Sequence, residues 1–116
     1  MLDWRRRWRL RSLQPSALRD YLSVPFPAPS QDYRDVEYIA VDLETTGLDA
    51  QRDQILSIGW VRILGNRIDL ASARHRLVRV HGEIPPDSAV IHQITDDLAA
   101  TGQELAAALP ELLQAL

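Results

Sequence analysis

The sequence predicts an α/β fold in which a three-stranded sheet is flanked by helices. Apolar runs rich in β-branched residues predict strands at 38–43, 54–64 and 67–80. Gly65-Asn66, between the second and third runs, is typical of a two-residue hairpin turn. A stripe of leucines at helical spacing near the end of the chain predicts a helix. A length of 116 residues leaves room for one ordinary domain.

Two segments precede the first predicted strand. Residues 1–23 are expected to form an Arg- and Trp-rich helical head, and residues 24–35 a proline-rich connector. Within the head, residues 1–20 hold six arginines against two aspartates, whereas residues 36–116 hold six arginines against twelve acids. A basic head on an acidic body indicates either an arm for phosphates or a head that docks on its own domain.

Trp4 and Trp8 raise a separate question about the head, because they lie four residues apart among arginines. They could stack on nucleic-acid bases or meet a membrane surface. Alternatively, they belong to an amphipathic helix that packs on the domain and leaves its arginines in solvent.

The hairpin carries detailed expectations of its own. A two-residue turn fixes register, so Ile63 should face Ile68 and Val61 should face Leu70. A change of apolar phase along the third strand predicts a bulge or break near 72–74.

The last helix is expected to begin and bend at particular residues. Thr101 and Glu104 have capping-box spacing, which predicts the start of this helix. Pro110 is expected to kink or divide it, because proline removes a backbone donor from the helix interior.

Two carboxylates interrupt the first predicted strand. Asp42 and Glu44 follow Ile39-Ala40-Val41, a run typical of a buried strand. Residues i and i+2 of a strand share one face, with Cα atoms about 6.5–7 Å apart, so both carboxylates point toward one spot. Their repulsion calls for a cation, either an arginine or a divalent ion; oxygen ligands suit Mg²⁺ or Mn²⁺. Gly47 would let the following backbone approach a ligand closely. A solvated strand end is the plain alternative.

Several stretches together resemble one known family. These are VDLETTGL (41–48), a loop containing Asp53, ILSIGWVRI (55–63), the hairpin, and IPPDSAVIHQIT (84–95). They resemble the DEDD (DnaQ-like) superfamily of 3′–5′ exonucleases, most nearly the epsilon proofreading subunit of DNA polymerase III. The resemblance covers residues 36–116 and implies a partial ribonuclease H-like exonuclease fold, with the carboxyl-terminal half absent.

The resemblance implies roles for individual residues. Asp42 and Glu44 match the first two carboxylates of the family's metal cluster, as catalytic and metal-binding residues. Thr45 and Thr46 are expected to contact the terminal nucleotide from the following loop. Ile91 and His92 match positions near its base, and these four are the expected substrate-binding residues. Gln93 departs from the glycine that is usual in the family, a departure that bears on the local backbone geometry and leaves the metals untouched.

The implied chemistry is hydrolysis of phosphodiester bonds at the 3′ ends of DNA or short RNA. The complete domain of the family holds two Mg²⁺ or Mn²⁺ ions with four carboxylates. Only the first two carboxylates have matches here, so we expect this chain to be inactive alone. Asp96 and Asp97 are not substitutes, and the histidines have no metal-ligand spacing. The alternative is a non-catalytic nucleic-acid or protein-binding module that retains half of the metal site.

Composition and the implied topology set the remaining expectations. No cysteine and no long apolar run occur in the sequence, so we expect a cytoplasmic protein without a membrane partner. Partners expected from the resemblance are nucleic-acid ends and a polymerase or repair assembly. In the family's fold, later strands pair with the strand at 38–43, so this strand should here have a free edge, or be covered by residues 1–35 or by a second copy of the chain. Self-association through that edge is a further expectation.

Overall fold

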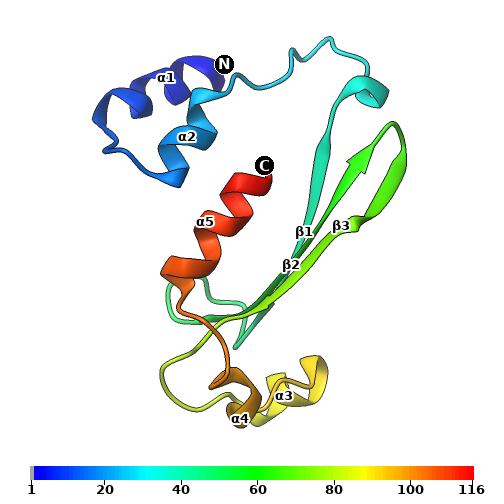
Figure 1. Ribbon diagram of the computed structural model, residues 1–116. Helices are drawn as coiled ribbons and strands as arrows, with labels where there is room; N and C mark the ends of the chain where they lie inside the picture. Colours follow the sequence, from blue (N-terminus) through cyan, green and yellow to red (C-terminus); the bar gives the residue numbers. More distant parts are fainter. Residues whose placement is uncertain (1) are drawn as a thin grey trace.

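A computed structural model describes residues 2–116 of the chain. The elements, in order, are α1 (Leu2–Ser12), α2 (Ala17–Ser23), the 3₁₀ turn η1 (Tyr33–Asp35), β1 (Tyr38–Thr45), β2 (Ile55–Leu64), β3 (Arg67–Leu77), α3 (Pro86–His92), α4 (Asp96–Ala99) and α5 (Leu105–Ala115). The strands form one antiparallel sheet in the order β1-β2-β3. Helix α5 lies along one face, with α1 and α2 near its carboxyl end and α3 and α4 beyond the opposite end of the sheet (Figure 1). The α/β prediction with a three-stranded sheet and flanking helices is confirmed.

The β2–β3 hairpin follows the predicted turn chemistry. Gly65 and Asn66 have φ of 52° and 61°, the left-handed conformation that a tight two-residue hairpin turn requires. Ile63 faces Ile68 as predicted.

A bulge in β3 then shifts the register of the hairpin between Trp60 and Arg62. The Ser72 hydroxyl fixes this bulge by accepting from the Arg62 amide at 2.8 Å. The prediction of a break near 72–74 is confirmed. The expected pairing of Val61 with Leu70 is wrong, because the register shift falls at these residues.

The core lies between the sheet and α5. Ile58 and Trp60 of β2 are buried against α5, where Ala108 is fully buried. Leu105 and Leu112 of the predicted leucine stripe pack against the same cluster. The amphipathic helix expected from the sequence therefore covers one face of the sheet.

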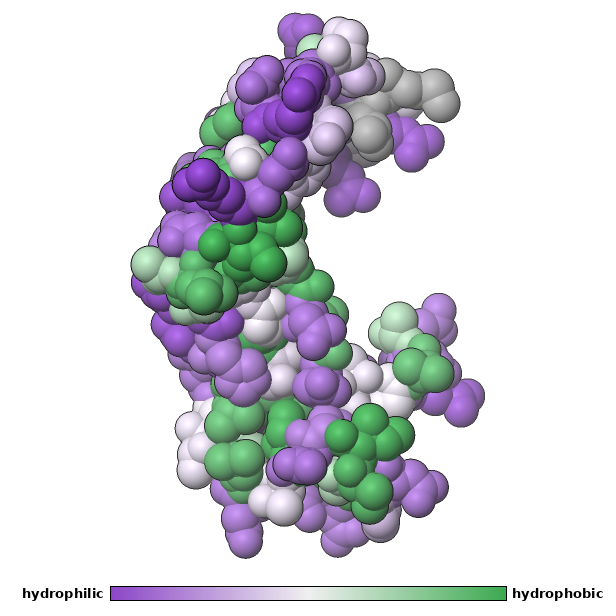
Figure 2. All heavy atoms as spheres, turned by 90° about the vertical axis from the view of Figure 1, so that its right-hand side faces the viewer, coloured by the Kyte–Doolittle hydropathy of each residue, from purple (hydrophilic) through white to green (hydrophobic). Residues whose placement is uncertain are grey.

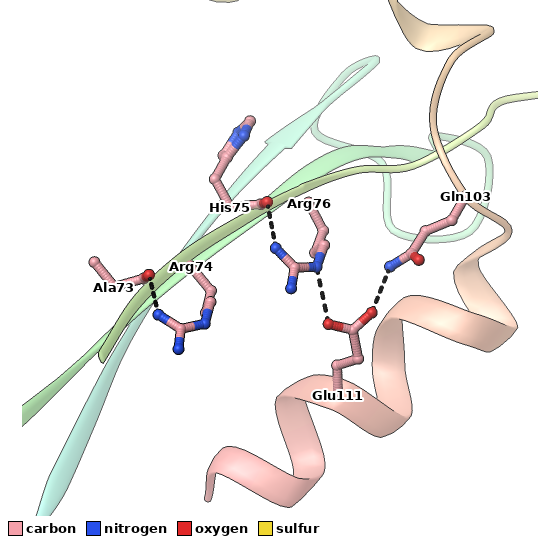
Figure 3. A network of polar contacts seen from close by, with 6 residues as sticks. All are labelled: Ala73, Arg74, His75, Arg76, Gln103 and Glu111. Carbon is pink, nitrogen blue, oxygen red and sulfur yellow. Dashed lines mark hydrogen bonds and ion pairs between the residues drawn. The ribbon is translucent and has the colours of Figure 1, made fainter. Parts of the chain in front are cut away.

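A polar network joins the sheet to α5 beside this core. Arg76 Nε of β3 donates to the Glu111 carboxylate of α5 at 2.8 Å (Figure 3). The Gln103 amide donates to the other oxygen of Glu111 at 3.1 Å. These two hydrogen bonds hold the pKa of Glu111 below its usual value, and the bond from Gln103 has the larger effect.

A second cluster closes the end of the sheet that lies near α3 and α4. Leu56 packs there with Ile84, Ile94 and Ala99. The Asp96 carboxylate accepts from the Ile84 amide at 2.9 Å and so ties α4 to the chain before α3. Asp96 therefore has a structural task at this end of the sheet.

Strand β1 lies at the edge of the sheet and, among the described strands, pairs with β2 alone. The predicted free edge is confirmed. The expectation that Ile39-Ala40-Val41 lies in the middle of a buried strand is wrong, because no described strand covers the outer side of β1. Val41 and Leu43 are each 45% exposed. Figure 2 shows the side of the molecule to the right of Figure 1, where hydrophobic residues reach the surface in several separate patches.

Two predicted boundaries differ from the structure. The sequence predicts a third strand to residue 80, but β3 ends at Leu77. The Val78 amide still donates to Leu56 O of β2 at 2.8 Å, and Val78 also forms a parallel bridge with Gln103. The predicted capping box is wrong as well: α5 begins after Glu104, and the Thr101 hydroxyl donates to Leu98 O. Pro110 does not divide α5.

Among residues 2–116, the helices are all too short or too polar to cross a membrane.

Candidate active site

Asp42 and Glu44 project from the face of the sheet that is turned away from α5. In β1 they pair with Gly59 and Ser57, which alternate with the core residues of β2. Residues directly opposite each other in an antiparallel pair share a face, so both carboxylates lie opposite the core side. Asp42 is exposed and Glu44 is half-buried. The two carboxylates thus share one face of one strand, as the sequence predicts.

Among residues 2–116, no arginine forms an ion pair with these carboxylates. Within the described residues, the ion pairs of the sheet and α5 join Arg62 to Glu37, Arg76 to Glu111 and Arg79 to Glu104, and none reaches Asp42 or Glu44. With arginine set aside among the described residues, a divalent ion and a solvated carboxylate pair are the two alternatives that stay open. The donor set fits a divalent ion, since two adjacent carboxylates on an open face supply hard oxygen ligands.

The loop after β1 is closed by Asp53. Its carboxylate accepts from the Thr46 hydroxyl at 3.0 Å and from the Asp49 amide at 2.8 Å. The Thr46 hydroxyl in turn accepts from the Gln54 amide at 2.9 Å. A Cβ on Gly47 would lie 2.5 Å from Asp53 Oδ2, so the loop can close in this way only around a glycine. The space that the sequence assigned to a ligand beside Gly47 is taken by Asp53.

These contacts separate the two threonines. Thr46 uses both its amide, which donates to Gln54 O at 2.9 Å, and its hydroxyl to close the loop. The Thr45 hydroxyl donates to Gly47 O at 2.6 Å. Both side chains therefore shape the backbone that leaves the carboxylate strand, and a contact between these residues and a nucleotide stays a prediction.

Helix α3 carries the other two expected substrate residues. Ile91 is 81% exposed, whereas His92 is half-buried. His92 Nδ1 accepts from the Ile94 amide at 3.0 Å, so the neutral ring carries its proton on Nε2. Within the described residues, Nε2 is buried and has no hydrogen-bond partner. Gln93 follows with φ of 59°, the left-handed conformation that glycine adopts most easily.

Two features of this face are not predicted from the sequence. One is the role of Asp53 in closing the loop, although its position four residues after Asp49 is a sequence signal for such a contact. His75 is the other, because it lies in the same row of the sheet as Asp42, with Gly59 between them. The bulge in β3 creates this alignment, so a simple count from the hairpin turn misses it.

Two carboxylates do not make a complete metal site. In the part of the chain that the structure describes, no three His, Asp or Glu side chains come together to hold an ion. The loop from Thr45 to Asp53 joins β1 directly, while α3 lies beyond the end of the sheet (Figure 1). The arrangement presents a carboxylate pair on a strand, next to a loop closed by hydrogen bonds, on an open face.

The fold and this carboxylate strand define the class of protein. Residues 39–116 match the family model RNase_T, described as an exonuclease. The chain therefore belongs to this exonuclease family, and the resemblance to the exonucleases of DNA polymerase III is confirmed.

Individual relatives agree with the family. The chain is similar to the PolC-type DNA polymerase III of Thermotoga maritima, with 36% identity over 81 residues, which are 70% of this chain and 6% of that protein. It is also similar to the DNA polymerase III epsilon subunit of Treponema pallidum, with 40% identity over 63 residues, which are 54% of this chain and 28% of that protein.

A solved structure is similar in fold. It is exonuclease X in complex with 5′ overhanging duplex DNA, with a TM-score of 0.56 and 27% identity; the match covers 64% of this chain and 42% of that chain. The sheet with its flanking helices is thus part of an exonuclease fold. The chain spans less than half of each of these three proteins.

Proposed function

We propose that this chain supplies the first half of the centre of a metal-dependent 3′–5′ exonuclease that acts on DNA or short RNA. The observation that carries the proposal is the pair Asp42 and Glu44, which lies on one face of β1 without an ion-pair partner among the described residues. The family match and the relatives among DNA polymerase III proteins support a nucleic-acid substrate and a polymerase or repair assembly as partner.

In this proposal Asp42 and Glu44 hold Mg²⁺ or Mn²⁺. Divalent ions supply positive charge that stabilises the attacking and leaving oxygens of a phosphodiester. Thr46 and Asp53 act as positioning residues, because their hydrogen bond fixes the loop that follows the carboxylates.

The expected substrate residues have distinct tasks in the same proposal. Thr45 contributes its backbone at the sugar end of the terminal nucleotide, and Thr46 shapes the loop beside it. Ile91, which is largely exposed, presents an apolar surface to the terminal base. His92 fixes the turn after α3 through its bond from the Ile94 amide.

We also propose that residues 1–23 act as a head, 24–35 as a connector and 36–116 as the first half of the exonuclease domain. Two carboxylates leave most of an octahedral shell to water, so metal binding by this chain is weak. The chain alone is then inactive as a nuclease. The second candidate function, a non-catalytic binding module, is favoured by the same count of two carboxylates.

A nuclease assay tests the proposal. The full chain and its Asp42→Asn variant are incubated with Mg²⁺ and an oligonucleotide labelled at its 3′ end. Both proteins are expected to release labelled nucleotide only at the background rate. Release by the wild type that is lost in Asp42→Asn would support the exonuclease role of Asp42 but overturn inactivity of the chain alone. Release that the variant retains would contradict the role of Asp42.

A further inference from the structure

We propose that the outward face of α1 is a binding surface for single-stranded nucleic acid, built from Trp4 and Trp8 with arginines on both sides. The surface lies in the head, outside the carboxylate site. Its binding needs no metal ion and no hydrolysis, so it stands or falls separately from the proposed nuclease function.

Arg6 sets the rotation of α1. Its side chain is buried, at 9% exposure for the residue, and its Nη1 donates to Leu22 O of α2 at 2.7 Å. Its Nε and Nη2 donate to the Asp3 carboxylate at 2.9 and 2.6 Å. These bonds hold the Arg6 side of α1 against α2, and α2 lies next to α5 (Figure 1). Arg6 therefore holds α1 against α2 within the head, and α2 is the part of the head that contacts α5.

Helical geometry then directs both indoles outward. Successive residues are about 100° apart around a helix, so Trp4 and Trp8 differ by about 40° and each lies about 160° from Arg6. The observed exposures agree, at 61% for Trp4 and 67% for Trp8. The expectation that these tryptophans pack on the domain is thus wrong. An exposed pair of large aromatic side chains on one helix face is characteristic of a contact surface.

The same geometry places a pair of arginines on each side of the indoles. Arg5 and Arg9 follow on one side, and Arg7 and Arg11 on the other. The Arg5 guanidinium lies 5.6 Å from the centre of the Trp4 ring. A hollow of about 340 Å³ on α1 is lined by Trp4, Arg5, Trp8 and Arg9. Aromatic and cationic groups therefore border one depression of the surface.

The charge of this face has no counterpart among the described residues. All four flanking arginines are exposed, and within residues 2–116 none of them forms an ion pair. Acidic residues of the body pair with arginines of the body instead, as Glu37 does with Arg62 and Glu111 with Arg76. Ion pairs therefore do not dock this face on the domain, and its guanidinium groups call for an anionic partner.

Single-stranded nucleic acid satisfies both chemistries of the face. Guanidinium groups bind phosphates through paired hydrogen bonds, and bases stack on indoles in a way that tolerates any sequence. Four residues advance a helix by about 6 Å. A base that stacks between two rings needs the rings about 7 Å apart, at about 3.5 Å for each contact, which is close to the distance between these two positions along the helix. A membrane surface fits less well, because an interfacial helix needs a broad apolar face and this one has only two indoles between its arginines.

The test measures, by fluorescence anisotropy in EDTA, binding of the full chain to a fluorescein-labelled oligothymidylate. The oligothymidylate has about twelve nucleotides, a length on the order of one single-strand binding site. Replacement of both Trp4 and Trp8 by Ala should weaken binding by about tenfold or more, since each stacked base contributes about 1–3 kcal/mol. Arg5→Gln with Arg9→Gln should reduce the slope of log K against log salt by about 1–1.5. Tyr33→Ala is the matched control, because Tyr33 is 63% exposed beside Arg34 but lies outside the head.

Tryptophan emission adds a direct readout. Unlabelled oligothymidylate should quench Trp4 and Trp8, while Trp60, only 6% exposed, keeps its emission in the double variant. Wild-type affinity in the double tryptophan variant would overturn the proposal. If a hairpin duplex binds as tightly as the oligothymidylate, the face contacts phosphates alone, and the proposed stacking of bases on the tryptophans is overturned. Binding of phosphatidylglycerol vesicles without binding of the oligonucleotide would assign the face to a membrane instead.

Discussion

Replacing Gly47 by Ala tests how the loop next to the carboxylates is held. A Cβ at this position would lie 2.5 Å from Asp53 Oδ2 and 2.7 Å from Asp53 Cγ, whereas ordinary contacts begin near 3.4 Å. The Asp53 carboxylate must therefore retreat by about 1 Å. Its hydrogen bonds from the Thr46 hydroxyl and the Asp49 amide, at 3.0 and 2.8 Å, cannot survive such a shift.

The cost follows from these two bonds. Hydrogen bonds to a charged group contribute about 1.5–3 kcal/mol each, and the lower value applies because the loop is partly exposed. Loss of both then costs about 3 kcal/mol. Replacing Gly by Ala returns about 0.4–1 kcal/mol by restricting the unfolded chain. We expect a net loss of about 2 kcal/mol, which lowers the urea midpoint by about 1 M at an m-value of about 2 kcal/mol/M.

Urea unfolding is compared among the wild type, Gly47→Ala, Asp53→Ala and the double variant, which tests whether the Asp53 carboxylate is the cause of the loss. In an Asp53→Ala background, Gly47→Ala should be neutral or slightly stabilising, because the obstructing carboxylate is gone. Gly59→Ala is the matched control, since the nearest atoms to its Cβ would be 3.9 Å away. A loss of stability from Gly47→Ala that persists without the Asp53 carboxylate would refute the reasoning.

The remaining predictions concern three other places in the fold. Gln93→Gly should raise the free energy of unfolding by about 0.5–1 kcal/mol, because φ of 59° strains a residue with a side chain more than it strains glycine; an unchanged thermal midpoint would contradict this. The Gln103 amide and then Arg76 lower the pKa of Glu111, so their stabilisation is present above the ordinary carboxyl pKa and is lost as pH falls through the lowered one. Glu111→Gln should therefore destabilise the chain in urea at neutral pH and cease to do so in acid; an equal effect at both would exclude the ionic contribution. Val41→Lys should reduce self-association through the free edge of β1, seen as a mass by light scattering that no longer rises with concentration; a monomeric wild type would rule out edge pairing.

The sheet could be predicted from sequence because its signals are local. Gly65-Asn66 supplies the two positive φ angles of the hairpin, and the alternation around Ile58 and Trp60 identifies the buried face of β2. Asp42 and Glu44 share a face because two residues of one strand at this spacing must do so. None of these inferences depends on how distant parts of the chain meet.

The failures depend on distant contacts. Ile39-Ala40-Val41 has the composition of a buried strand, yet burial requires a neighbour on each side, and β1 has one among the described strands. Trp4 and Trp8 point outward because Arg6 binds Leu22 O, sixteen residues away. The role of Gly47 depends on Asp53, which returns to it only after the loop closes. Composition alone predicts none of these.

The most direct measurement is binding of Mn²⁺ to the full chain, followed by paramagnetic broadening of backbone amide signals. Strand β1 around Asp42 and Glu44 should broaden first, with a dissociation constant on the order of 1 mM, because two carboxylates fill only part of the shell. Asp42→Asn with Glu44→Gln should abolish the effect there, while Asp96→Asn with Asp97→Asn, the control pair, should not. Broadening of β1 that survives in the first double variant would contradict the assignment of this strand as the metal-binding part of an exonuclease centre.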